Sequence, residues 1–163
     1  MLNLPDEYLK HEFTIGILDD ITQLSLPSVT PRFLSSSLDS TAIVYGYGGD
    51  GSISACKNAI TTLGEHFSWQ VNAQFDYDSK KSGNITTTYL RLSPELIRAP
   101  YPLRQSGLLS VAHMKLLVER DVAAQLMPKG TLLLNTPLTG AALWNALPIG
   151  LQCKIQSDQI KVM

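Results

Sequence analysis

Short apolar segments rich in β-branched residues alternate along this chain with longer segments whose apolar residues recur at helical spacing. The short segments predict strands at residues 12–18, 41–45, 69–75, 85–92, 108–112, 131–135 and 159–163. The helical spacing predicts helices at residues 53–63, 114–126 and 138–147, with Gly64 as the stop of the first and residues 128–130 as the stop of the second. This alternation predicts an α/β fold with three layers (α/β/α), a mostly parallel, mixed sheet and a Rossmann-like arrangement.

The domain organisation follows from a change in composition near Asp39. Residues 25–40 are rich in Ser, Pro and Thr, which is typical of a linker. We therefore expect an N-terminal arm and linker over residues 1–38 and an α/β domain over residues 39–163. A chain of 163 residues with 44% hydrophobic residues has enough material for one substantial core.

The charge balance argues against a nucleic-acid partner, and the hydropathy pattern argues against a membrane-spanning helix. Thirteen basic and 14 acidic residues give a net charge of -1, so the chain has no broad positive field for nucleic acid. No apolar run approaches the roughly 20 residues of a membrane helix, and the N-terminus lacks a signal-peptide pattern, so we expect a cytoplasmic protein. Only 17% of the residues are charged, below the roughly 25% of typical domains, which suggests a surface that faces a partner.

The cysteines and histidines do not form a metal-binding pattern. Cys56 and Cys153 lack a CxxC companion, and we expect both to be small buried side chains. His11, His66 and His113 each stand without a second ligand at metal spacing. We expect His113, which follows an apolar strand, to be a core or edge histidine with its hydrogen bonds satisfied.

A glycine-rich turn joins the predicted strand 41–45 to the helix that follows it. Gly46, Gly48 and Gly51 fit the pattern G-x-G-x-x-G, in which backbone amides approach a phosphate. A dinucleotide site also requires an acidic residue about 20 positions further on, and Asp76 and Asp78 come later than that.

Two other interpretations of the turn remain open. The triplet Gly49-Asp50-Gly51 resembles the start of a thiamine diphosphate and magnesium motif, for which Asn72 would be the second metal ligand. A tight strand-to-helix turn without any ligand is the simplest interpretation.

Several segments together resemble one family, the pyruvate:ferredoxin (flavodoxin) oxidoreductases, and specifically their γ-type domain. The most specific is residues 77–83, Tyr-Asp-Ser-Lys-Lys-Ser-Gly, which matches that family's motif in full. Residues 46–58 resemble its G-x-G-S-D-G-T-V-G-A-N-K-N stretch. Residues 13–22, 87–91, 97–101, 112–113 and 132–136 follow the family in order and spacing. Four positions depart from its pattern, with Gly49 in place of Ser, Ser54 of Gly, Cys56 of Asn and Asn84 of Gly.

The resemblance implies a role within a larger enzyme. Members of the family convert pyruvate, coenzyme A and an oxidised acceptor, ferredoxin or flavodoxin, to acetyl-CoA, CO₂ and the reduced acceptor. Thiamine diphosphate, Mg and the iron-sulfur clusters would then be held by other domains or subunits, which are the expected partners. The family's equivalent domain continues beyond residue 163, so we expect a C-terminally incomplete domain, whether excised, split or truncated, that is inactive in isolation.

The resemblance also implies a site that contributes binding of coenzyme A and no catalytic residue. Backbone amides of the turn and the paired lysines would meet its phosphates. The predicted site residues are Gly48, Gly49, Asp50, Gly51, Ser52, Lys80, Lys81 and Asn135. Helix capping by Asp50 and a solvated lysine turn are the alternatives. A stand-alone interaction module without catalytic activity, or a small dinucleotide-binding domain, is the alternative function.

Overall fold

The computed structural model describes residues 12–15, 17, 21–26, 40–67, 69–77, 83–99 and 101–163. The chain divides into two compact units, Met1–Phe33 and Leu34–Met163. In the first unit, β1 (Thr14–Ile15) pairs in parallel with β2 (Ser25–Leu26). Of the strand predicted at residues 12–18, only Thr14 and Ile15 are in a strand among the residues described there, so it is shorter than expected.

The second unit is built on a mixed six-stranded sheet with the order β4-β5-β3-β6-β7-β8. β3, β6, β7 and β8 are mutually parallel neighbours, whereas β5 is antiparallel to both β3 and β4. The six strands are β3 (Ser40–Tyr47), β4 (Gln70–Asp76), β5 (Ile85–Ser93), β6 (Ser106–Val111), β7 (Leu126–Leu134) and β8 (Lys161–Val162). The predicted α/β fold with a mixed, mostly parallel sheet is confirmed.

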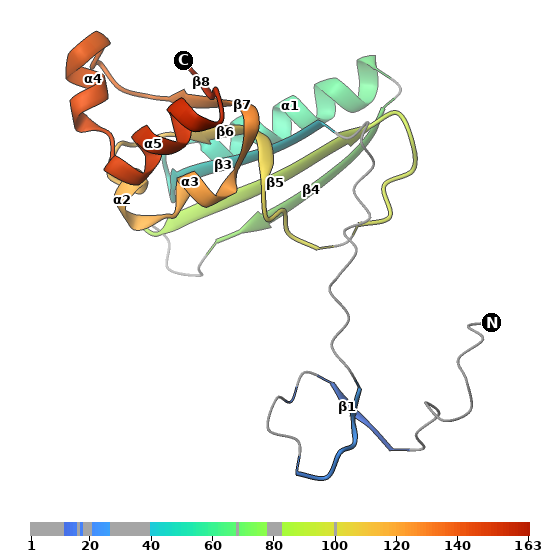
Figure 1. Ribbon diagram of the computed structural model, residues 1–163. Coiled ribbons are helices and arrows are strands. Elements are labelled where there is room, and N and C mark those ends of the chain that lie inside the picture. The colour runs from blue at the N-terminus through green and yellow to red at the C-terminus, as the bar shows by residue number, and fades with distance from the viewer. Residues whose placement is uncertain are drawn as a thin grey trace. The chain divides into compact units, whose positions relative to one another are not determined.

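Helices cover the two faces of this sheet differently (Figure 1). The long helix α1 (Ser52–His66) packs on one face through Cys56, against Ala42 of β3 and Leu90 of β5. The opposite face carries the larger core, in which Ile43, Leu109 and Leu132 are fully buried. The alternation along each strand separates these two sets of side chains, because neighbouring residues of a strand point to opposite faces.

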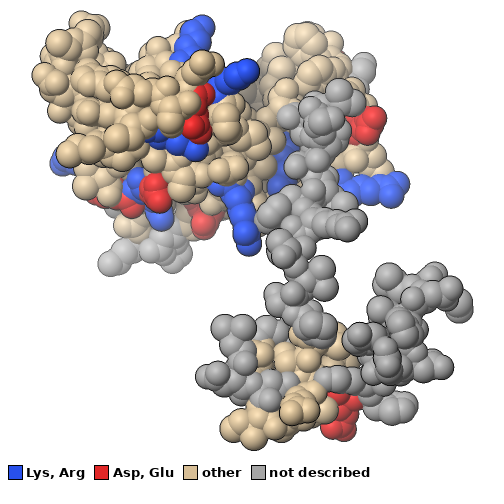
Figure 2. Space-filling view, in the orientation of Figure 1, with Lys and Arg blue, Asp and Glu red and all other residues tan. Residues whose placement is uncertain are grey.

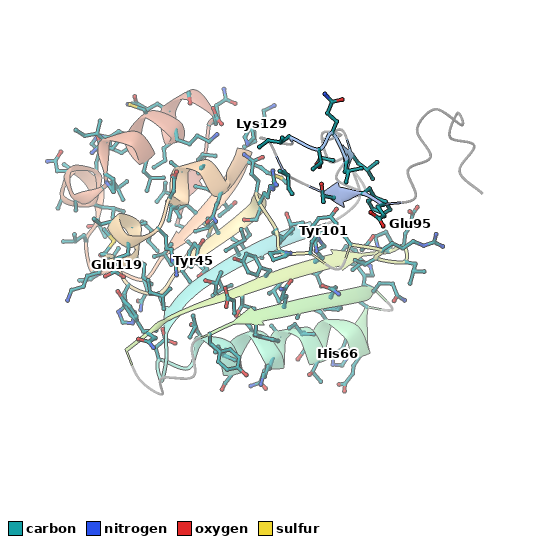
Figure 3. All side chains as sticks on the ribbon, turned by 90° about the horizontal axis from the view of Figure 1, so that it is seen from below. Tyr45, His66, Glu95, Tyr101, Glu119 and Lys129 are labelled. Carbon is teal, nitrogen blue, oxygen red and sulfur yellow. The ribbon has the colours of Figure 1, made fainter. Side chains whose placement is uncertain are left out.

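Four short helices cover the larger core. They are α2 (Leu116–Glu119), α3 (Val122–Gln125), α4 (Gly140–Ala146) and α5 (Ile149–Ser157). Figure 3 shows them on the side of the sheet opposite α1, whose last residue is His66. Tyr45 of β3 belongs to the core under the short helices. The result is the predicted arrangement of three layers.

Two predicted helix ends are wrong. α1 continues through Gly64 to His66, and the amide of Phe67 then bonds the carbonyl of Leu63. A glycine inside a helix costs only about 1 kcal/mol, which the contacts of α1 with the sheet offset. Residues 128–130 do not end a helix but lie inside β7, where they form part of an irregularity in the pairing with β6.

The helix predicted at residues 114–126 is broken into α2 and α3. Arg120 between them is extended, with φ -131° and ψ 143°. The side chain of Asp121 then accepts a hydrogen bond from the amide of Ala124 and starts α3. The break allows Leu116 and Leu126 to be fully buried in the same core, which a straight helix would not provide.

The C-terminal region differs from expectation in two further respects. The helix predicted at residues 138–147 is α4, but α5 was not predicted, because its apolar residues have weak helical periodicity. Cys153 on α5 is exposed, whereas Cys56 is buried as expected.

Candidate functional site

The candidate site lies where two neighbouring parallel strands send the chain to opposite faces of the sheet. β3 leads into α1 on one face, and β6 leads into α2 on the other. The divergence opens a crevice beyond the carboxyl ends of these strands, the place where open α/β sheets bind their ligands. Asn135 follows β7 at the same end of the sheet, and its backbone N–H donates a hydrogen bond to the carbonyl of Val111.

The carboxylate of Asp50 holds the glycine turn together. It accepts hydrogen bonds from the amide of Tyr47 at 2.7 Å and from the amide of Ser52 at 2.8 Å. The amide of Asp50 in turn bonds the carbonyl of Tyr47 at 3.0 Å. The turn is thus closed by its own acidic side chain, which satisfies one of the free amides at the start of α1.

Three glycines of the turn have an identifiable structural reason. A Cβ atom on Gly46 would lie 2.2 Å from the Oγ of Ser52 and 2.6 Å from the Oδ2 of Asp50, so only glycine admits these side chains. Gly49 and Gly51 have φ angles of 96° and 86°, in the left-handed region that favours glycine. Gly51 is also the N-cap of α1, without any side-chain cap.

The immediate surroundings keep Asp50 ionised. Its burial would raise the pKa, but hydrogen bonds from Ser52 and from the Tyr47 amide, together with His113, outweigh this effect and lower it. The Nε2 atom of His113 lies 3.8 Å from the Oδ2 atom of Asp50. The side chain of His113 is 48% exposed, whereas that of Asp50 is 15% exposed.

A tyrosine connects this pair to a second acid. The ring of Tyr47 lies against the imidazole of His113, with 5.1 Å between their centres. Its hydroxyl donates a hydrogen bond to the carboxylate of Glu119 at 2.8 Å. Desolvation and this hydrogen bond raise the pKa of Tyr47, so the phenol is protonated at neutral pH. Figure 3 marks Glu119 near the end of the sheet that carries the turn.

Two cavities flank the turn. The inner cavity, of about 360 Å³, lies between the turn and the ends of β6 and β7, and is lined by Asp50, Gly51, Ser52, Ala55, Ala112, His113 and Asn135. The outer cavity, of about 310 Å³, is lined by Tyr47, Gly49, Asp50, Gly51, Ile53 and Ser54. Both volumes fall at the lower end of the roughly 300–1,000 Å³ of ligand pockets.

The structure brings together most of the predicted site residues that it describes. Asp50, Gly51, Ser52 and Asn135 line the inner cavity, and Gly49 lines the outer one. Gly48 does not line either cavity. Instead, its amide bonds the carbonyl of Asn84 at 2.8 Å, and its carbonyl accepts from the amide of Gly83 at 3.4 Å. The predicted Lys80 and Lys81 lie outside the described residues.

The thiamine diphosphate and dinucleotide interpretations of the turn do not fit the register and order of the strands. Asn72 pairs with Arg91, and Arg91 pairs with Thr41 at the start of β3. Thr41 precedes Tyr47 by six residues, or about 20 Å along a strand, so Asn72 lies at the wrong end of the sheet to share a metal with Asp50. For a dinucleotide site, Asp76 lies on β4, and β5 separates β4 from β3. Asp78 lies outside the described residues.

His113 lines the inner cavity, although sequence reasoning did not place it among the candidate site residues. It was expected to be a core or edge histidine; the core position is wrong, because its side chain is 48% exposed and lines the inner cavity. The signal that would have found it is its position, since it follows the strand next to the glycine turn and residues there border the crevice.

Metal-binding and membrane features were also searched. Within the described ranges, no three or more His, Cys, Asp or Glu side chains gather as metal ligands would. None of the helices in the described part of the chain has the length and apolar character needed to cross a bilayer.

Comparison with known families identifies the class of protein. Residues 41–163 match the family model described as pyruvate ferredoxin/flavodoxin oxidoreductase. A probable pyruvate-flavodoxin oxidoreductase of Escherichia coli K12 is 37% identical over 93% of this chain, and the pyruvate-flavodoxin oxidoreductase of Rhodospirillum rubrum is 38% identical over 94%. The chain belongs to this family, and it spans 13% of the length of these relatives. It therefore corresponds to one component domain of them.

Solved structures agree with this assignment at the level of the fold. A pyruvate oxidoreductase subunit from Thermotoga maritima matches with a TM-score of 0.54 and 19% identity, over 67% of this chain and 56% of that one. A 2-oxoglutarate:ferredoxin oxidoreductase from Magnetococcus marinus, with 2-oxoglutarate, coenzyme A and succinyl-CoA bound, matches with a TM-score of 0.54 and 14% identity, over 78% of this chain and 20% of that one.

Proposed function

We propose that this chain is the γ-type component domain of a pyruvate:ferredoxin (flavodoxin) oxidoreductase and that it contributes to coenzyme A binding. The whole enzyme would convert pyruvate, coenzyme A and oxidised acceptor to acetyl-CoA, CO₂ and reduced acceptor, in the cytoplasm. Thiamine diphosphate, Mg and the iron-sulfur clusters would belong to its other domains. The domain itself would bind and position the thiol carrier and leave bond making to the rest of the enzyme.

The observation that carries this proposal is the junction between the glycine turn and the lysine-bearing loop. Gly48 exchanges two backbone hydrogen bonds with Gly83 and Asn84, the residues that follow that loop. Lys81 precedes Gly83 by two residues, so covalent geometry limits the distance between their Cα atoms to about 7 Å. The contact of Gly83 and Asn84 with the turn supports our proposal that the turn and the two lysines contribute to one site for a phosphorylated ligand.

The outer cavity is the place we assign to the phosphates. Ile53 and Ser54 belong to the first turn of α1, where helix geometry supplies no partner for the backbone amides. The positive end of the helix dipole and the ammonium groups of Lys80 and Lys81 would add favourable charge. A lysine contributes to such a site as a point charge.

The surface around α4 and α5 suits contact with another domain of the same enzyme. Residues 130–153 contain no Asp, Glu, Lys or Arg, and Figure 2 shows an almost uncharged surface over α4. Ile149 is 78% exposed, and Leu138 is 38% exposed. Since the relatives are much longer than this chain, the rest of such an enzyme is the partner that we assign to this surface.

The test is calorimetric titration of coenzyme A into the chain and into its Lys80→Ala and Lys81→Ala variants. We expect Kd to rise at least about tenfold in each variant, because a hydrogen bond to a charged group contributes about 1.5–3 kcal/mol. Lys161→Ala is the matched control, since Lys161 is exposed on β8, at the edge of the sheet farthest from β4. Equal binding by all four proteins would refute the lysine contacts. No binding by any of them would favour the stand-alone interaction module.

A further inference from the structure

We propose that β4 pairs with β4 of a second copy of this chain, antiparallel and across a two-fold axis, so that two sheets join into one. The interface is the free edge of β4, extended at its two ends by Trp69 and Tyr77. The inference goes beyond the proposed function and does not depend on it, because it concerns an edge of the sheet and not the crevice.

The free edge belongs to a long and regular strand. β4 is the first strand in the order β4-β5-β3-β6-β7-β8, and β5 is its one neighbour within the described part of the chain (Figure 1). Its seven residues pair with β5 without a bulge, whereas β8 at the opposite edge has two residues. An edge strand presents a row of N–H and C=O groups without a strand partner, and another chain can pair with them.

The usual protections of an edge are missing from this strand. Natural edge strands avoid pairing by carrying lysine or proline, by bulges, or by being very short. Residues 70–76, Gln-Val-Asn-Ala-Gln-Phe-Asp, contain neither Lys nor Pro, and Asp76 at the end is their one charged residue. The edge of β4 is therefore suited to pairing with a second strand.

The alternation along β4 is self-complementary. Ala73 and Phe75 pack against the core under α1, whereas the alternate residues from Gln70 to Asp76 are polar and exposed. Pairing centred on Ala73 places these residues opposite one another: Ala73 and Ala73, Val71 and Phe75, Trp69 and Tyr77, Asn72 and Gln74, and Gln70 and Asp76. Apolar residues meet apolar residues, polar meet polar, and no two like charges are opposite. A second copy of the chain is therefore the partner that fits this edge.

Exposed aromatic residues at both ends of β4 support the same register. Trp69 precedes the strand and is 41% exposed, and Tyr77 follows it and is 63% exposed. In the dimer, Trp69 of each copy lies opposite Tyr77 of the other, so one aromatic pair closes each end of the interface. Aromatic cross-strand pairs stabilise sheets, and Trp and Tyr are enriched in protein interfaces.

The helices on the sheet leave room for this pairing. α1 packs against residues of β3, β5 and β4, and β5 is the middle strand of these three. Neighbouring strands lie about 4.8 Å apart, so the β5 strands of the two copies, and the helices above them, are about 14 Å apart. Packed helices need only about 8–10 Å between their axes. The two copies of α1 therefore do not collide.

Sedimentation equilibrium of the 163-residue chain and two double variants tests the pairing. Asn72→Glu with Gln74→Glu places glutamates opposite one another in the dimer. Asn72→Glu with Gln74→Lys is the matched control, because it places a glutamate opposite a lysine at the same positions. Both positions are exposed, and Asn72 pairs with Arg91 of β5. Both double variants should therefore keep a melting temperature near that of the wild-type chain in dilute solution, and melting curves check this.

We expect the wild-type chain to pass from monomer to dimer over about 5–500 µM and to form no larger oligomer, because a two-fold interface is closed. The Kd of the dimer should rise at least about tenfold in the variant with two glutamates and should not rise in the control, since like charges opposite one another destabilise a strand pair. Trp69→Ala should raise it at least about threefold. Phe67→Ala, at a residue that is 57% exposed but outside the register, should change it less than about twofold.

Other outcomes overturn the inference. It is wrong if the wild-type chain stays monomeric throughout this range, if it forms open-ended oligomers, or if the two double variants dimerise equally. Titration with coenzyme A is a separate measurement, so failure of the strand pairing leaves the proposed function standing. Dimerisation as expected, with no binding of coenzyme A, would leave the strand pairing standing without it.

Discussion

Replacing Asp50 by alanine should destabilise the domain more than the loss of an ordinary helix cap. The variant loses two hydrogen bonds from backbone amides to a carboxylate, at 2.7 and 2.8 Å. Hydrogen bonds to charged groups contribute about 1.5–3 kcal/mol each. Because the turn lies at the surface, where water can replace part of this, we expect a total cost of about 2–3 kcal/mol.

The assay is unfolding in urea, with the midpoint lowered and the slope unchanged. Asp121→Ala is the comparison, since the side chain of Asp121 accepts a single amide at 3.1 Å at the start of α3, and loss of such a cap costs about 1 kcal/mol. A cost for Asp50→Ala no greater than that of Asp121→Ala would refute the view that the carboxylate holds the turn.

The pH dependence provides a second check on the same variant. The folded-state pKa of Asp50 lies below the ordinary value of 3.8. A lowered pKa means that the carboxylate stabilises the fold above its unfolded-state pKa and that this contribution is lost as the pH falls through the folded-state value. The stability difference between the wild-type chain and Asp50→Ala should therefore be full near pH 7 and shrink below about pH 4. A difference independent of pH would contradict this account.

Substitutions at two further positions, each compared with a control substitution, test the surrounding structure. Arg91 is 3% exposed and donates hydrogen bonds to two backbone carbonyls, both at 2.7 Å. Arg91→Ala should therefore lower the free energy of unfolding by about 3 kcal/mol. Arg98→Ala, at an exposed position, is the control and should change it by less than about 0.5 kcal/mol. Gly46→Ala should lower the free energy of unfolding by about 2–3 kcal/mol, because the added Cβ would clash with Ser52. Gly107→Ala is the control, since its Cβ would meet its nearest atom at 3.9 Å. It should cost under about 1 kcal/mol in the same urea assay.

The sequence predicted strands well where several β-branched or large apolar residues adjoin, as in β3 and β5. It failed where tertiary packing decides the conformation. Arg120 has no intrinsic reason to be extended, and its conformation follows from the burial of side chains on both sides of it. The order of the strands was likewise beyond local pattern, because the insertion of β5 between β4 and β3 depends on pairing between distant segments.

For the site, the glycine turn was predictable because its glycines and Asp50 adjoin in the sequence. The capping alternative for Asp50 is met only in part: its carboxylate accepts from the amide of Ser52, the first residue of α1, but the N-cap is Gly51, and the second hydrogen bond comes from Tyr47 within the turn. The approach of His113 and Asn135 to this turn was harder to predict, since it depends on the parallel strand order β3-β6-β7. The core position expected for His113 was wrong, because an isolated histidine after an apolar strand carries no sign of whether it faces a core or a crevice.

The most direct test of the account is a titration of the isotopically labelled chain with coenzyme A, followed by amide NMR shifts. The account predicts that the shifts gather at the turn, the start of α1, the ends of β6 and β7, and Gly83 and Asn84. Shifts confined to the opposite end of the sheet, where Asn72 and Thr41 lie, would contradict it.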